Sequence, residues 1–98
     1  MKIIDTLQEL KGRTKHAERK MVEDKYDVIQ LQMEKDEEIT EHHAKEETLI
    51  IVRNGKVEFD VEGKKVVLTN ENLLQMEPYE KHSLKAIEKT DFILLKFK

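Results

Sequence analysis

The sequence contains no cysteine, a single proline and only three glycines, and each scarcity excludes a class of site. Without cysteine there is no disulfide, no thiolate zinc site and no cysteine nucleophile, which is compatible with a reducing compartment. Isolated glycines exclude a glycine-rich phosphate loop. The apolar run Leu49–Val52 is far too short to span a membrane, and the first residues lack the apolar segment of a secretion signal. We therefore expect a soluble, cytoplasmic protein that does not bind membranes.

Charged residues are abundant, but neither sign dominates. The 21 acidic and 18 basic residues are interspersed and leave a net charge of −3. Nucleic-acid binding needs a basic patch that neutralises phosphates, so we predict no nucleic-acid partner. A chain of 98 residues, 40% of them charged, buries one modest core. Part of the stability is therefore expected to come from a second copy, in a homodimer.

Short apolar segments alternate with turn signals along most of the chain. Ile29, Leu31 and Met33 alternate with polar residues, which predicts a strand, and a second strand is expected before the turn at residues 24–27. The polar segment 34–47 is expected to be a loop with one short strand that carries His42.

The second half of the chain gives clearer strand signals. Residues 48–53 are rich in β-branched side chains and precede Asn54-Gly55, a dipeptide typical of tight hairpins. We expect a hairpin there and another turn at Glu62-Gly63. Eight or nine strands at intervals of roughly 8 to 12 residues indicate a sandwich or barrel. The apolar positions in residues 3–10 fit either a short helix or an edge strand.

Two segments carry a family resemblance. His42 and the hairpin sequence VRNG form the first, and Glu71-Asn72 through Pro78 to His82 form the second. With these segments, the chain from about Asp27 to Phe97 resembles a small single-domain cupin of the conserved-barrel type. The resemblance implies an all-β double-stranded β-helix, or jelly-roll barrel, over residues 27–98. Residues 1–26 would be an N-terminal arm with the first strand, exchanged between the copies of a dimer, and the whole chain one domain.

The resemblance also implies a metal site with missing ligands. Cupins hold a metal with two histidines one residue apart, a nearby glutamate and a final histidine. Counting back from Gly55, His42 takes the first position, Ala44 the second and Thr48 the glutamate position, while His82 takes the last. A third ligand is Glu46, which shares sequence parity with His42. We therefore expect a divalent ion (Zn, Mn, Fe or Ni) with an incomplete ligand set of His42, His82 and Glu46.

Strand alternation places the following side chains inside the barrel: His42, Thr48, Ile50, His82 and Leu84. Two interpretations stay open. They line a pocket for a small-molecule ligand, or they fill a packed core with satisfied histidines. His43 is expected on the opposite face of its strand, and His16, among charged neighbours, on the surface.

Two functions of different class follow. The first is a binding protein whose histidine pocket takes a small molecule or a weakly held divalent metal. The second is a metal-dependent cupin enzyme of the oxygenase or isomerase type. Neither a reaction nor a catalytic residue can be assigned from the sequence.

Overall fold

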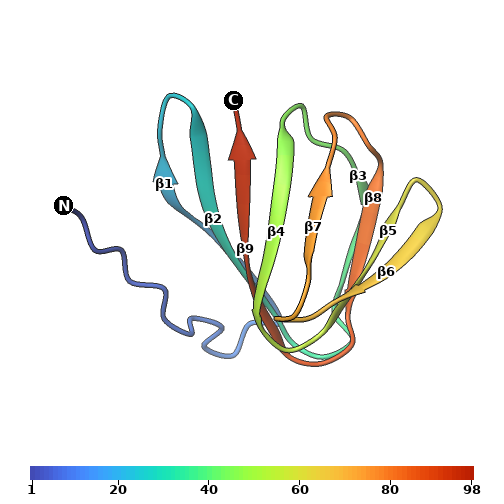
Figure 1. Ribbon diagram of the computed structural model, residues 1–98. Coiled ribbons are helices and arrows are strands. Elements are labelled where there is room, and N and C mark those ends of the chain that lie inside the picture. Colours follow the sequence, from blue (N-terminus) through green and yellow to red (C-terminus); the bar gives the residue numbers. More distant parts are fainter.

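The computed structural model describes residues 1–98 and consists of strands without any helix (Figure 1). It therefore contains no helix long and apolar enough to cross a membrane. Residues before Lys15 form no regular element. The strands are β1 (Lys15–Val22), β2 (Tyr26–Met33), β3 (Glu38–His42), β4 (Glu47–Asn54), β5 (Val57–Val61), β6 (Lys64–Leu68), β7 (Leu73–Met76), β8 (His82–Ala86) and β9 (Thr90–Phe97).

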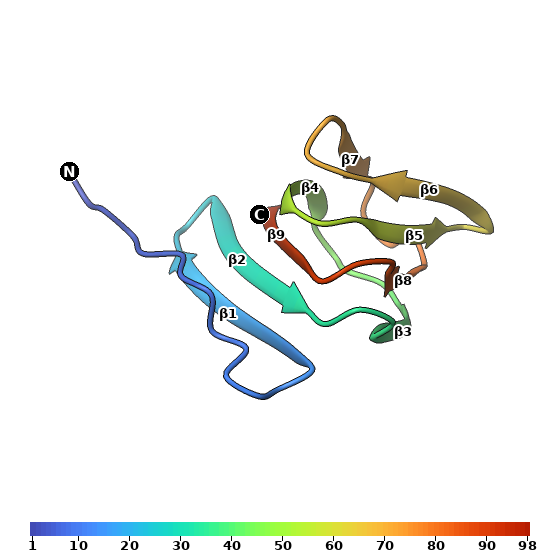
Figure 2. The same ribbon diagram turned by 90° about the horizontal axis from the view of Figure 1, so that it is seen from below.

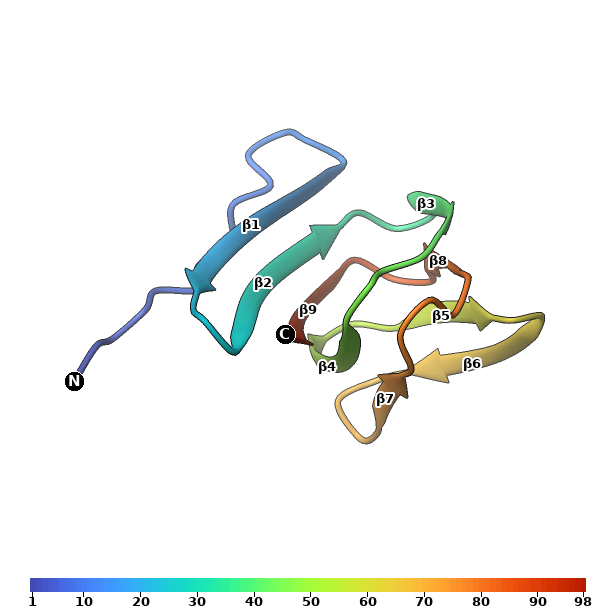
Figure 3. The same cartoon turned by 90° about the horizontal axis from the view of Figure 1, so that it is seen from above.

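The strands form two antiparallel sheets that face each other. The five-stranded sheet has the order β1-β2-β9-β4-β7, and the four-stranded sheet has the order β3-β8-β5-β6. Figures 2 and 3 view them from the two ends and place the first residues outside the barrel, beside β1 and β2. The expected all-β fold is confirmed, as is the expected pairing of β1 with β2.

Side chains that alternate along the strands form one core between the sheets. Ile50 and Val52 of β4 meet Phe92 of β9 from one sheet, and Val57 and Phe59 of β5 come from the other. Phe59 and Phe92 pack edge to face with ring centroids 6.1 Å apart. Burial of such apolar side chains supplies the main stabilisation of a small barrel.

The two glycine turns expected from the sequence have different outcomes. Glu62 and Gly63 join β5 to β6 with φ values of 51° and 83°. This is the two-residue hairpin geometry in which both residues have positive φ. The hairpin expected at Asn54-Gly55 is wrong, because β4 and β5 belong to different sheets and do not pair.

Gly55 instead makes a corner between the sheets. Its φ is 86°, and a Cβ atom there would lie 2.1 Å from the carbonyl oxygen of Lys89. The site requires glycine because the backbones approach so closely. Dipeptide chemistry therefore predicted the turn but not the sheet that the next strand joins.

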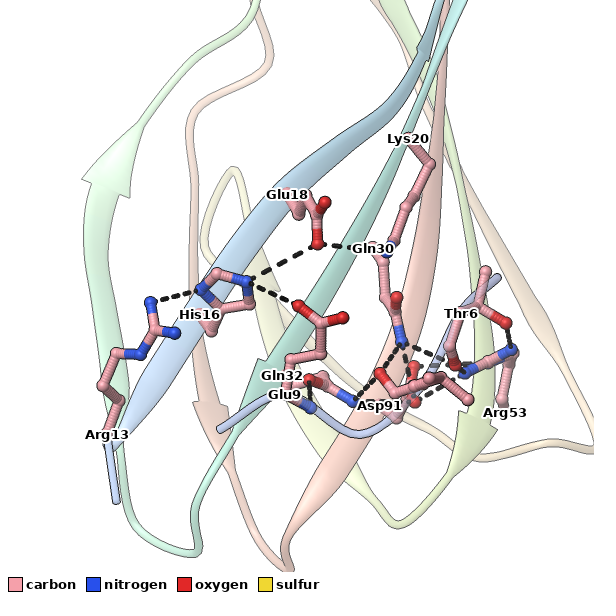
Figure 4. A network of polar contacts seen from close by, with 11 residues as sticks. Thr6, Glu9, Arg13, His16, Glu18, Lys20, Gln30, Gln32, Arg53 and Asp91 are labelled. Atoms are coloured by element: carbon pink, nitrogen blue, oxygen red, sulfur yellow. Dashed lines mark hydrogen bonds and ion pairs between the residues drawn. The ribbon is translucent and has the colours of Figure 1, made fainter. Parts of the chain in front are cut away.

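The N-terminal arm, residues 1–14, forms neither the helix nor the edge strand expected, and its residues 6–9 lie on the outer face of the five-stranded sheet. Gln30 and Gln32 point outward from β2 and donate to the carbonyl oxygens of Thr6 and Leu7 at 3.2 to 3.3 Å. Gln32 also accepts from the Glu9 amide at 2.8 Å. These contacts, drawn in Figure 4, hold residues 6–9 against the sheet.

Candidate functional site

The structure brings His42 and His82 together. They are partners across the β3–β8 pair, and their ring centroids lie 4.1 Å apart in an edge-to-face arrangement. The His82 side chain is buried, whereas His42 is exposed. The pair therefore has one ring inside the barrel wall and one open to solvent.

Hydrogen bonds fix the tautomer of both rings. His42 Nδ1 lies 3.0 Å from the Thr40 carbonyl oxygen, and His82 Nδ1 lies 3.0 Å from the Glu80 carbonyl oxygen. A carbonyl only accepts, so Nδ1 carries the proton in each ring. In the neutral rings both Nε2 atoms keep a free lone pair, which is the state that binds metals or accepts hydrogen bonds.

Burial lowers the pKa of the His82 imidazole below its ordinary value of 6.5. The hydrogen bond to the Glu80 carbonyl opposes this shift, and the nearby charges of His42 and Lys96 add to it. His82 therefore keeps its Nε2 lone pair to a lower pH than an exposed histidine.

The other predicted pocket residues belong to the packed core. Thr48 and Ile50 are at most 2% exposed, Leu84 is 6% exposed, and the Thr48 hydroxyl donates to the Glu46 carbonyl at 3.2 Å. Leu84 lines one of the four surface cavities, whereas His42, Thr48, Ile50 and His82 line none of them. Of the two interpretations, the filled interior matches this packing.

Glu46 does not join the histidine pair. The group of three potential ligands whose donor atoms lie within 4.8 Å of one another is Glu9, His16 and Glu18. It lies on the outer face of β1 and in the arm, as Figure 4 shows, and not at the barrel histidines. His16, expected to be a plain surface residue, has a side chain that is only 19% exposed.

The cluster at His16 already carries its own cations. Arg13 Nη1 lies 2.9 Å from His16 Nδ1, and because a guanidinium only donates, Nδ1 must accept. The proton of the neutral ring is then on Nε2, which faces Glu9 at 3.8 Å and Glu18 at 3.7 Å. Lys20, with a side chain 8% exposed, lies 3.0 Å from Glu18, and this hydrogen bond chiefly lowers the pKa of the Glu18 carboxyl. A metal here would have to displace both cations.

The alternation of side chains along β1 is the sequence signal that could have indicated two members of this cluster. His16 and Glu18 are two residues apart and so share a face. What the sequence does not show is Glu9, which reaches them only because Gln32 holds its backbone. His43 is exposed as expected, with its ring centroid 6.0 Å from that of Tyr79.

Several solved structures of other proteins have an architecture similar to that of this chain. An RmlC-like cupin with a double-stranded β-helix fold from Methanocaldococcus jannaschii superposes with a TM-score of 0.85, at 14% identity, over 99% of this chain and 90% of that one. A Streptococcus pyogenes protein of unknown function gives 0.80 at 15% identity, covering 100% and 96%. A cupin superfamily protein from Desulfitobacterium hafniense gives 0.80 at 13% identity, covering 87% and 78%.

The chain has the cupin fold. No family model and no curated protein matches the sequence. The identities to the solved structures are low, so the likeness extends to the cupin barrel and not to a ligand or a reaction. This cupin barrel holds two groups of potential metal-ligating side chains, the His42–His82 pair and the Glu9–His16–Glu18 cluster.

Proposed function

We propose that the protein is a binding protein whose His42–His82 pair takes a weakly held divalent transition-metal ion. The observation that supports this is the matched tautomer of the two rings. Each Nδ1 donates to the carbonyl two residues earlier, which leaves the lone pairs of both Nε2 atoms available to a metal ion. Nitrogen donors oriented by a second hydrogen bond suit zinc, nickel, iron and manganese.

The residues present fit such an ion only in part. Two imidazoles provide half of the ligand set of the resembled family, because Ala44 and Thr48 stand at the other two positions. Glu46 does not form a group of three potential metal ligands with His42 and His82. Waters or a small exogenous ligand would complete the coordination, which argues for weak and exchangeable binding.

An accompanying small molecule would reach the pair from the exposed side of His42. The interior behind His82 is packed around Phe59, whose ring centroid lies 6.4 Å from that of His82. An enclosed organic ligand is therefore disfavoured, and a small ligand at the barrel surface fits better. With no cysteine to suggest an oxidising compartment, we place this function in the cytoplasm.

Metal titration tests the proposal. Calorimetry with Zn²⁺ or Ni²⁺ should give one weak site, and His42→Ala and His82→Ala should each weaken it by roughly tenfold or more, because a direct ligand counts at least as much as a supporting one. His16→Ala and His43→Ala are matched controls that should leave the affinity unchanged. Binding that survives both His42→Ala and His82→Ala, or that disappears with His16→Ala, would refute the assignment.

The alternative function, a metal-dependent enzyme, predicts a different metal content of the purified protein. A metal-dependent enzyme should carry near-stoichiometric metal without supplementation, and lose it when both histidines are replaced. Elemental analysis of protein purified without added metal separates this outcome from the weak, exchangeable binding proposed here.

A further inference from the structure

A cavity of about 440 Å³ lies between the N-terminal arm and the five-stranded sheet. We call it the arm cavity. It is lined by residues 6–8 of the arm, Gln32 of β2, residues 53–54 of β4 and residues 89–91, where β9 begins. Figure 4 shows Thr6, Arg53 and Asp91 of this lining close together. The volume lies within the range of sites that bind small molecules.

The arm cavity is separate from the histidine pair. His82 begins β8, whereas Lys89 follows the end of that strand, so the whole of β8 lies between them. Gln32, Arg53 and Asp91 point outward, because each adjoins a core residue along its strand. The arm cavity therefore lies outside the barrel, and neither histidine lines it.

The lining of the arm cavity is almost entirely polar. Leu7 is the one apolar residue among the nine that line it. An apolar ligand would take these polar groups out of water without giving them hydrogen-bond partners, which is costly. The arm cavity therefore suits a polar ligand that forms hydrogen bonds with the lining.

The chain already neutralises the single acidic residue of the lining, Asp91. Its Oδ1 and Oδ2 accept from the Arg53 guanidinium, and Oδ2 also accepts from the side-chain amides of Gln30 and Gln32 at 3.2 Å. Such charge-assisted hydrogen bonds satisfy a carboxylate strongly. Asp91 therefore neither needs a cation from outside nor strongly repels an anion.

Three lining residues keep donors that the chain leaves unused. Gln8 accepts from the Leu10 amide at 2.7 Å through its side-chain oxygen, which leaves its amide nitrogen free. The Asn54 side chain is exposed and forms no hydrogen bond within the chain. The Lys89 ammonium lies 3.7 Å from the Glu34 carboxylate, and both side chains are about half exposed. Exposed pairs of this kind are weak, so Lys89 is available to a ligand.

We propose that the arm cavity is a second ligand site, which takes a small hydroxylated molecule with one carboxylate. Two cations of the lining, Arg53 and Lys89, face one anion, Asp91, so the lining carries one net positive charge. A single excess cation matches one carboxylate better than a doubly charged phosphate. Lys89, Asn54 and Gln8 provide the donors for the carboxylate and the hydroxyl groups.

Binding at this site also holds the arm in place. Gln8 belongs to the arm, whereas Lys89 precedes β9, so a ligand that contacts both links the arm to the sheet. A ligand that binds only the docked arm stabilises the docked state by mass action. This coupling gives the site a readout that does not depend on the metal.

Amide NMR of the full chain, freed of metal by dialysis, tests the proposal with gluconate as the probe. Sorbitol is the matched neutral probe, because it carries a hydroxyl group where gluconate has its carboxylate. Gluconate should shift the amides of residues 6–8 and 89–91 with a dissociation constant of about 1 mM, the weak affinity expected of a partly open site. Sorbitol and inorganic phosphate should cause much smaller shifts at the same concentration.

Two variants change the proposed donors. Lys89→Gln should raise the dissociation constant for gluconate roughly tenfold, because it removes a charge-assisted hydrogen bond. Gln8→Glu keeps an oxygen for the Leu10 amide but replaces the free donor with a negative charge, and should weaken binding at least as much. Lys85→Gln removes the same charge from an exposed residue of the other sheet, and His42→Ala alters the histidine pair. Both controls should bind gluconate as the wild type does.

Proteolysis measures the effect on the arm. Saturating gluconate should slow trypsin cleavage after Lys11 and Arg13 severalfold, because cleavage requires local release of the segment. Unchanged cleavage, no amide shifts up to about 20 mM gluconate, or equal shifts with sorbitol would overturn the proposal. Tighter binding of phosphate, or equal weakening by Lys89→Gln and Lys85→Gln, would also overturn it. Loss of binding in His42→Ala would place the carboxylate at the histidine pair instead.

Discussion

Arg53 donates two hydrogen bonds to Asp91, from Nε to Oδ1 at 3.2 Å and from Nη2 to Oδ2 at 2.7 Å. The same guanidinium donates to the Thr6 carbonyl at 2.9 Å, and the same carboxylate accepts from Gln30 and Gln32. One bidentate ion pair thus joins β4, β9, β2 and the arm. Such a geometry is stronger than an ordinary surface pair.

Replacing Asp91 by asparagine should therefore release the arm. The Asp91 side chain is only 14% exposed, so the neutral amide leaves the Arg53 charge without its partner, and we expect a loss of about 2 kcal/mol in urea unfolding. Trypsin should also cleave faster after Lys11 and Arg13. Glu88→Gln is the control: its pair with Lys56 is exposed on both sides, so stability should change by less than about 0.5 kcal/mol. Equal effects of the two substitutions would contradict the role given to Asp91.

Gly55→Ala should destabilise the barrel strongly. The added Cβ would overlap the Lys89 carbonyl, and the residue would also adopt an unfavourable positive φ, so we expect a loss of about 3 kcal/mol or more. Gly63→Ala shares the positive φ but meets no atom within 4 Å, and should cost only about 1 kcal/mol. Chemical denaturation of the two variants measures the difference. Similar losses would mean that close approach does not matter at Gly55.

Acid should weaken the fold partly through His82. Because its folded pKa is lower than the ordinary 6.5, the unfolded chain binds the proton more readily. The contribution of His82 to stability is complete above pH 6.5, falls as the pH drops below that value, and stops falling beneath the folded pKa. Denaturation curves between about pH 7.5 and about pH 5 should show a smaller loss for His82→Gln than for the wild type. His43→Gln, at an exposed ring, should follow the wild type.

Restoring a missing ligand should strengthen metal binding. Ala44 stands at the second histidine position of the resembled family, and its carbonyl already holds the Tyr79 amide at 2.8 Å through backbone alone. Ala44→His should therefore keep the loop and raise the affinity for Zn²⁺ or Ni²⁺ by roughly tenfold or more. Calorimetry measures this, with Ala44→Gln as a control of similar size. No gain over the glutamine variant would argue against a metal at His42 and His82.

The strands were predictable because their signals are local. Ile29, Leu31 and Met33 alternate as a half-buried strand must, and all three lie on the inner face of β2. Glu62-Gly63 behaves as a hairpin turn because only two residues decide its geometry. Asn54-Gly55 has the stronger hairpin signal, yet it serves as a corner, since the choice of sheet depends on packing against Lys89, distant in sequence.

The candidate site, like the fold, was only partly predictable from the sequence. The resemblance to cupins predicted that His42 and His82 meet, and the pairing of β3 with β8 brings them together. The Glu9–His16–Glu18 cluster did not follow, because Glu9 reaches β1 only through the docking of the arm on Gln32. The contact depends on how the arm, which has no regular secondary structure, lies on β2. Such a contact produces no periodic pattern in the sequence.

The hydrogen bonds that hold residues 6–9 of the arm are mainly to its main chain, whereas the side chain of Leu10, which follows them, is itself buried. Gln30, Gln32 and Arg53 reach carbonyl oxygens and one amide, with the Thr6 hydroxyl as the single arm side chain bound by these three. These hydrogen bonds therefore depend little on which side chains the bound residues carry. Substitutions at Leu7, whose side chain is exposed, can therefore alter what the arm offers to other molecules while leaving its path across the sheet unchanged.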